Sequence, residues 1–155
     1  MPEIKSVPFL NTADSIPVVR FCLADGTEGI CIIDTGSELT VFDSQFVLDY
    51  VDNFRIRKTK SKINIVGMQL NNEAALVYTN TAVCFEKTWN KTNALPIKHA
   101  LILNLNNLSG HIKDTEGNEV SVSAIIGSDV LSKHKTKIDF SEKKLWFYND
   151  IAGDR

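Results

Sequence analysis

Residues 30–37 read Ile-Cys-Ile-Ile-Asp-Thr-Gly-Ser, an aliphatic run that ends abruptly in an acid, a glycine and two hydroxyl side chains. Four apolar residues in succession predict a strand buried in a sheet, and the polar residues predict a loop leaving the sheet core. Gly36 permits a tight turn whose backbone amides point at the carboxylate of Asp34. We expect Thr35 to turn its hydroxyl inward and Ser37 to donate a hydrogen bond to Asp34. Asp34 is therefore a candidate functional carboxylate on a supported loop.

The segment before this loop predicts a β-hairpin. Residues 16–24 alternate, with Val19, Phe21 and Leu23 on one face of a strand. Asp25-Gly26 is a strong tight-turn signal leading into the aliphatic run. Asp34 thus follows the second strand of a hairpin.

The rest of the chain predicts mostly strands. Further apolar runs bounded by polar turns lie at 39–42, 63–66, 75–78, 82–85, 99–103, 120–126, 138–140 and 145–148. The runs between 63 and 85 indicate a long hairpin with its tip near residues 67–73. A short helix capped by Asp43 or Ser44 is expected before Val51, with others across about 105–114 and 128–134. Strands with two or three brief helices indicate a barrel or sandwich.

Composition indicates a globular protein. The chain has 155 residues, 43% of them hydrophobic and 23% charged, which suits one domain spanning residues 1–155. Its net charge of -2 offers no general attraction to nucleic acid or to an anionic membrane. The basic run between Arg55 and Lys62 has no interleaved aromatic side chains, so we interpret it as the solvated face of a strand. We therefore expect neither a nucleic-acid partner nor a membrane partner.

The cysteines and histidines predict no cofactor. Cys22, Cys31 and Cys84 form no Cys-x-x-Cys pair, a pattern that favours three buried thiols in a reducing compartment. The three histidines have no metal-ligand spacing. The N-terminal residues do not resemble a secretion signal, and no apolar run reaches about 18 residues. These features favour a cytoplasmic protein.

A second motif follows the first by about 90 residues. It reads Ile-Ile-Gly-Ser-Asp-Val-Leu at residues 125–131. Together with the hairpin and Asp-Thr-Gly-Ser, it resembles the retropepsin-like aspartic proteases, the single-domain dimeric branch of the pepsin group. Residues 135–140, Lys-Thr-Lys-Ile-Asp-Phe, look like the closing strand of bacterial and DNA-damage-inducible-type members. The resemblance covers about residues 16–148.

The resemblance implies a mainly β, closed barrel-like retropepsin fold with a flap hairpin. In such a fold Asp34 is catalytic, and Thr35 interlocks with its counterpart across a two-fold axis. Gly127 supports the active-site loop from behind, while Gly36 and Ser37 belong to the loop itself. The residues implied for the flap that closes over a peptide are Val66, Gly67, Met68 and Gln69. The segment departs from some relatives, because it has one glycine and no central aromatic residue.

One Asp-Thr-Gly in one domain provides half of such a site. The mechanism needs two carboxylates that share a proton, so the second Asp34 is expected from another copy of the chain in a two-fold homodimer. The expected function is aspartic endopeptidase activity on a peptide or protein substrate, with no metal or covalent intermediate. The alternative is a non-catalytic module of the same fold that binds peptides or dimerises. The intact Asp34-Thr35-Gly36 favours the enzyme, since a module without turnover has no need of the acid.

Two other acids receive structural predictions. Asp129 lies in the second motif, and we expect it to cap the short helix that starts beside it. Asp139 is interpreted as a strand-end or turn residue.

Overall fold

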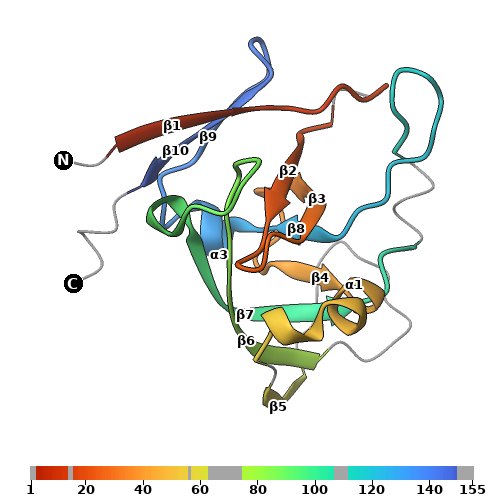
Figure 1. Cartoon of the computed structure of the whole chain (residues 1–155), viewed down its shortest axis with the longest axis vertical. Helices are drawn as coiled ribbons and strands as arrows, with labels where there is room; N and C mark the ends of the chain where they lie inside the picture. The colour runs from red at the N-terminus through yellow and green to blue at the C-terminus, as the bar shows by residue number, and fades with distance from the viewer. Residues whose placement is uncertain (1–2, 14–15, 56, 63–74, 107–111, 150–155) are drawn as a thin grey trace.

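The computed structural model describes residues 3–13, 16–55, 57–62, 75–106 and 112–149. Its strands are β1 (Glu3–Pro8), β2 (Val18–Cys22), β3 (Glu28–Ile33), β4 (Val41–Asp43), β5 (Arg57–Lys62), β6 (Ala75–Val83), β7 (Leu95–Leu103), β8 (Ala124–Ile126), β9 (Lys137–Asp139) and β10 (Lys144–Asn149). Its helices are α1 (Ser44–Asp49) and α3 (Ser128–Leu131), with the 3-10 turns η1 (Val51–Asn53) and η2 (Lys91–Asn93). The described part of the chain is mainly β with short helices, as the sequence predicts (Figure 1).

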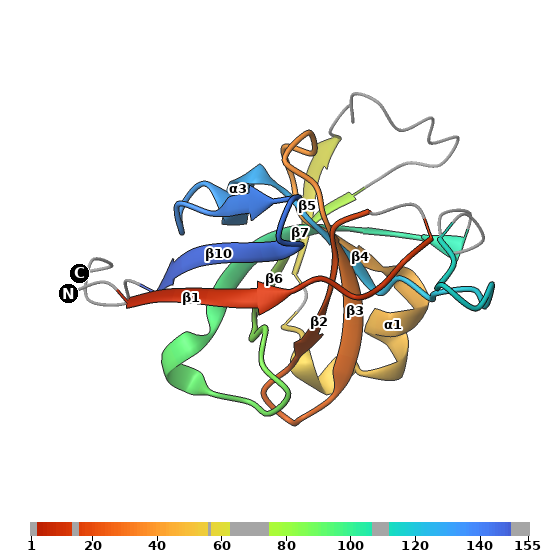
Figure 2. The ribbon, with the colours of Figure 1, turned by 90° about the horizontal axis from the view of Figure 1, so that it is seen from above.

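The strands form two sheets. The larger has seven strands in the order β2-β3-β8-β4-β7-β6-β5, and the smaller has three in the order β1-β10-β9. In the larger sheet β3 pairs with β8 in parallel and β4 pairs with β7 in parallel, whereas the other neighbours are antiparallel. Figure 2 shows β1 and β10 side by side along the flank of the larger sheet, away from α1.

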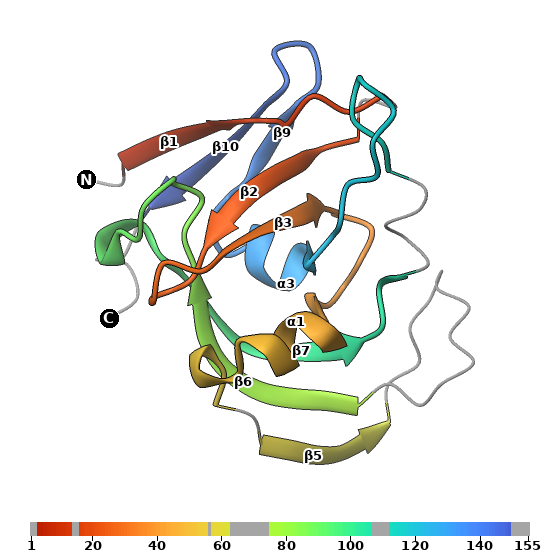
Figure 3. The same ribbon diagram turned by 45° about the vertical axis from the view of Figure 1, so that its right-hand side comes forward.

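The larger sheet curls until it meets itself. Cys22, at the end of β2, forms an antiparallel bridge with Cys84, the residue that follows β6. The two residues exchange backbone hydrogen bonds of 2.8 and 3.0 Å. Figure 3 looks onto this curl, with β2 and β3 facing β6 and β7 across α1 and α3. The bridge gives the sheet its closed, barrel-like form, as expected.

Apolar residues pack on both sides of the curled sheet. The larger cluster contains six buried phenylalanine rings, of which Phe42 and Phe54 meet edge to face with centroids 5.1 Å apart. A second cluster includes Val41, Leu101 and Ile125. Together these clusters contain buried side chains from β2, β3, β4, β6, β7 and β8.

The aliphatic run before Asp34 has a direct structural explanation. Cys31 and Ile33 of β3 pack in the larger cluster, while Ile30 and Ile32 pack against the second cluster. Successive side chains of a strand point to opposite faces, so a strand covered on both faces needs apolar residues at every position. The hairpin predicted before Asp34 is confirmed, since β2 and β3 pair antiparallel around the turn that contains Gly26.

Asp43 ends β4 and begins α1. One carboxylate oxygen accepts a hydrogen bond from Phe46 N at 3.1 Å, so Asp43 rather than Ser44 is the cap. The other oxygen accepts from Leu105 N at 2.8 Å. This buried side chain therefore joins α1 to the segment that follows β7.

Several predicted strand bounds are wrong. β7 begins at Leu95, earlier than the predicted residue 99, and β8 covers only the last three residues of the predicted 120–126 strand. Val120 N donates to Ile112 O, whereas Ser123 N donates to Ile30 O. Because these bonds go to separate partners, no continuous ladder forms before Ala124.

Two predicted helix bounds also differ. α3 ends at Leu131 rather than at residue 134, because Lys135 adopts a φ of 49° and Thr136 N returns to Leu131 O. The helix predicted across 105–114 lies largely at 107–111, outside the described residues. Its predicted end is wrong, since Lys113 pairs with Glu119 in an antiparallel bridge.

β1 has no counterpart among the predictions. Its six residues pair with β10 in a continuous antiparallel register from Glu3 opposite Asn149 to Pro8 opposite Lys144. The segment carries little apolar alternation, so its strand depends on a partner at the other end of the chain. The hairpin of β9 and β10 is confirmed.

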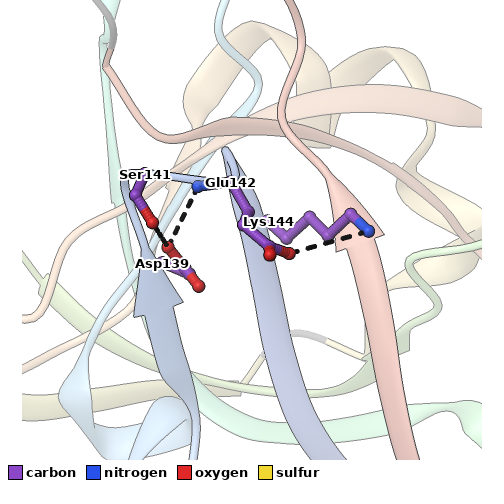
Figure 4. A network of polar contacts seen from close by, with 4 residues as sticks. All are labelled: Asp139, Ser141, Glu142 and Lys144. Atoms are coloured by element: carbon purple, nitrogen blue, oxygen red, sulfur yellow. Dashed lines mark hydrogen bonds and ion pairs between the residues drawn. The ribbon is translucent and has the colours of Figure 1, made fainter.

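Asp139 organises the turn between β9 and β10. One carboxylate oxygen accepts from Ser141 Oγ at 2.6 Å and from Glu142 N at 3.0 Å (Figure 4). Lys144 lies 4.0 Å from Glu142 in an exposed ion pair that contributes little to stability. The prediction of Asp139 as a strand-end residue is confirmed.

The three cysteines are buried and free, as predicted. In the described part of the chain, no helix combines the length and apolar character that a bilayer span requires.

Candidate active site

Asp34 follows β3 at the edge where β8 also ends. Its backbone N–H donates to Ile126 O at 3.0 Å, which extends the parallel pairing of the two strands by one bond. Because parallel strands end at the same edge, the loops that follow them are neighbours. The Asp-Thr-Gly-Ser loop and the Gly-Ser-Asp motif, distant in sequence, therefore meet here.

The loop closes into a tight turn on its own carboxylate. Asp34 Oδ1 accepts from Gly36 N at 2.9 Å, and Ser37 N donates to the Asp34 carbonyl at 3.2 Å. Asp34, Thr35 and Gly36 are exposed, whereas Ile33 directly before them is buried. The turn thus presents one carboxylate and one threonine to the surface from a rigid, buried strand.

Ser37 does not act as predicted. Its hydroxyl donates to Leu39 O at 2.7 Å, not to Asp34. Its carbonyl accepts from Ser128 N at 2.7 Å. Ser37 therefore shapes the return of the loop and ties it to α3, because a serine hydroxyl readily bonds a carbonyl two residues away.

Gly127 packs directly behind the loop. A Cβ built on this glycine would lie 2.6 Å from Ser37 O and 2.7 Å from Leu39 O. Both contacts are backbone atoms, so a side chain here would displace the loop itself. Gly127 thus contacts the backbone of the loop that carries Asp34.

Thr40 and Asp129 form a clamp that sequence reasoning missed. Thr40 is fully buried, and its Oγ1 donates to Asp129 Oδ1 at 2.8 Å. Its backbone N–H donates to Asp129 Oδ2 at 3.1 Å, and its Oγ1 accepts from Gly127 N at 3.1 Å. Three hydrogen bonds therefore hold the end of the Asp34 loop against the first turn of α3. The one sequence signal was a hydroxyl residue directly before the apolar β4.

Asp129 does more than the predicted cap. Its Oδ1 accepts from Val130 N at 2.9 Å, but the N-cap position of α3 is Gly127, which makes no side-chain cap bond. Its carboxylate serves chiefly to bind Thr40 across a sequence separation of 89 residues. The prediction of a simple helix cap is therefore incomplete.

The flap prediction falls mostly outside the described residues. β5 and β6 pair antiparallel, with Lys62 opposite Ala75, which confirms the stem of the long hairpin. Val66, Gly67, Met68 and Gln69 belong to residues 63–74, which the structure does not describe. The flap residues remain a prediction.

Within the described ranges, no three histidine, cysteine or acidic side chains gather so that they could hold a metal ion. The exposed carboxylate of Asp34 lies at this edge on its clamped loop.

No protein-family model matches the chain, and no curated protein matches it. Solved structures do. A retropepsin-like aspartic protease from Rickettsia conorii superposes with a TM-score of 0.55 and 12% identity, over 96% of this chain and 93% of that one. The chain has a retropepsin-like fold. The retroviral protease-like domain of Ddi1 from Leishmania major has a TM-score of 0.51 and 14% identity, over 84% of this chain and 86% of that one. At these low identities the likeness shows a shared fold alone.

Proposed function

We propose that the chain is a homodimeric aspartic endopeptidase whose catalytic group is Asp34. The observation that carries the proposal is the exposed Asp-Thr-Gly turn at the end of a buried strand, clamped from behind by Gly127, Thr40 and Asp129. A nucleophilic water needs a carboxylate held in a fixed position, and this turn provides one. The retropepsin-like fold supports the same conclusion.

In the proposed reaction two Asp34 carboxylates, one from each copy, hold the attacking water between them. Two carboxylates about 3 Å apart cannot both ionise, so one carries a proton. The ionised group takes a proton from the water as it attacks the peptide carbonyl. The protonated group stabilises the tetrahedral oxygen, and a proton then passes to the leaving amine.

The remaining site residues receive supporting roles in this proposal. The exposed Thr35 interlocks with its counterpart across the two-fold axis, and Gly36 N fixes one oxygen of the acid. Residues 66–69 close over an extended peptide. Apolar side chains beside the cut are preferred, since ligand sites in proteins are lined mainly by apolar side chains.

We also propose a place within the family. The Ile-Asp-Phe sequence at residues 138–140, which begins in β9, favours the bacterial or DNA-damage-inducible-type branch. The whole chain, residues 1–155, would form a single domain in each protomer. Three free cysteines favour a reducing compartment such as the cytoplasm.

The decisive experiment compares Asp34→Asn with a matched control. Asp25 lies at the other end of β3 and accepts from Thr27 N at 2.8 Å, two residues ahead, just as Asp34 accepts from Gly36 N. A peptide library should be cleaved by the wild type and by Asp25→Asn across acid to neutral pH. Asp34→Asn should lose cleavage by at least about 10³-fold while remaining a folded dimer.

Two outcomes would overturn the proposal. Undiminished cleavage by Asp34→Asn would remove Asp34 from catalysis. A wild type that binds peptides or dimerises without cleaving any member of the library would instead support the non-catalytic module.

A further inference from the structure

The bridge that closes the curled sheet is made by two cysteines. Cys22 and Cys84 stand directly opposite each other and exchange both backbone hydrogen bonds. In such an antiparallel pair the Cα atoms lie about 5.5 Å apart. Disulfide bonds span Cα separations of about 4.4–6.8 Å. The backbone at this bridge therefore has the spacing that a disulfide requires.

Both side chains point to the same side of the sheet. Phe21 and Leu23, the neighbours of Cys22, pack in the larger apolar cluster, and so do Val83 and Phe85, the neighbours of Cys84. Because side chains alternate along a strand, both cysteines face away from that cluster. Cys84 Sγ donates to Thr88 O at 4.0 Å, and both cysteines are fully buried. The two side chains thus lie on the same buried face of the sheet.

We propose that Cys22 and Cys84 are an oxidisable pair that forms a cross-strand disulfide and locks the closed sheet. The oxidant is a low-molecular-weight disulfide. One protein thiolate attacks it, forms a mixed disulfide and releases one thiol; the second protein thiolate then displaces the other thiol. Two protein S–H bonds are lost, one protein S–S bond forms, and the oxidant is reduced to two thiols.

The segment that follows Cys84 covers the pair. Thr88 lies in the segment that follows Cys84, where Lys87 and Thr88 are exposed. Burial above all, and then the neighbouring Cys84, raises the pKa of the Cys22 thiol to about 11. Since the thiolate is the attacking species, oxidation is slow and follows local opening of this cover.

Cys31 provides a matched control. It is as completely buried as the pair, but it lies in β3, packs in the larger cluster and stands opposite Val19. Its substitution leaves the Cys22–Cys84 bridge unchanged. A disulfide that formed through general unfolding would involve all three cysteines, whereas the proposed one spares Cys31.

The test uses the folded full chain incubated with glutathione disulfide, then denatured and alkylated before intact-mass and peptide analysis. We expect the intact mass of the wild type and of Cys31→Ser to fall by two hydrogens. Cys22 and Cys84 should then resist alkylation, and digestion should yield one disulfide-linked peptide that contains both. Cys22→Ser and Cys84→Ser should form no internal disulfide. The oxidised wild type should melt about 10 °C higher than the same sample after reduction, because the bond closes a loop of about 60 residues.

Other products would overturn the proposal. They are a stable mixed disulfide, a bond that includes Cys31, a bond between two chains, or three alkylated cysteines after prolonged oxidation. Each would show that Cys22 and Cys84 do not form a disulfide with each other. The first measurement is made on the wild type, so the result does not depend on the folding of any variant.

Discussion

Gly127 packs against the backbone of the loop that carries Asp34. A methyl group there would meet two carbonyl oxygens at 2.6 and 2.7 Å, and neither oxygen can move without shifting residues 37–39. Gly127→Ala should therefore destabilise the protein by about 1–3 kcal/mol and lower its melting temperature by several degrees. The control is Lys133→Ala, at an exposed position just beyond α3. Equal melting temperatures for wild type and Gly127→Ala would contradict the packing described.

Thr40 carries a second prediction at the residue scale. Thr40→Val keeps the shape of the side chain but leaves Gly127 N and Asp129 Oδ1 without their hydroxyl partner. Burial makes the loss cost about 1–3 kcal/mol. Urea unfolding should show a larger loss for Thr40→Val than for Thr40→Ser, which removes a methyl group and keeps the hydroxyl. The reverse order would mean that packing, rather than the clamp, stabilises the loop.

The residue scale also shows where sequence reasoning reaches its limit. The bond between Gly36 N and Asp34 Oδ1 spans two residues, and the glycine in the turn was sufficient to predict an amide facing the acid. The Ser37 hydroxyl had two acceptors within reach, and residue type alone could not choose between them. The partner of Thr40 lies 89 residues away, so it became identifiable only when β3 and β8 were paired.

At the element scale, Asp139 stabilises the turn between β9 and β10 by accepting hydrogen bonds. The hydroxyl of Ser141 and the backbone N–H of Glu142 lower the pKa of Asp139 below its ordinary 3.8. A carboxyl with a lowered pKa in the folded state stabilises that state fully above about pH 4, and the contribution disappears as the pH falls through the folded-state pKa. The turn between β9 and β10 thus contributes to acid sensitivity.

A pH series tests this turn. Between about pH 2 and 6, the melting temperature of Asp139→Asn should fall less steeply than that of the wild type. Ser141→Ala keeps the Asp139 carboxyl but removes the hydrogen bond from the serine hydroxyl. It should therefore also make the melting temperature fall less steeply with pH. Profiles of equal slope for all three proteins would show that the turn does not contribute.

How well the sequence predicted a strand depended on how near its pairing partner lies in the sequence. The β2–β3 hairpin and the β9–β10 hairpin join neighbouring segments, and local turn residues were enough to predict both. β1 was missed because its partner lies at the opposite end of the chain. β8 was overextended because alternation before Ala124 indicates burial, and burial occurs there without a ladder.

At the scale of the whole molecule, the proposed site needs two copies of the chain. Specific peptidase activity should therefore fall on dilution below the dimer dissociation constant, because each protomer supplies one Asp34. Sedimentation measured over the same concentrations should show the dimer converting to monomer as activity is lost. Constant specific activity in a sample that sediments as a monomer would exclude a shared site.

The parallel pairing of β3 with β8 has a further consequence for synthesis. Residues 31–33 meet residues 124–126, so the backing of the Asp34 turn is synthesised long after the turn itself. A nascent chain that stops before Gly127 lacks both Gly127 and Asp129 and cannot clamp the turn. Contacts this distant in sequence also form slowly during folding. The carboxylate-bearing loop therefore leaves the ribosome without its clamp, because Asp129 is synthesised 89 residues after Thr40.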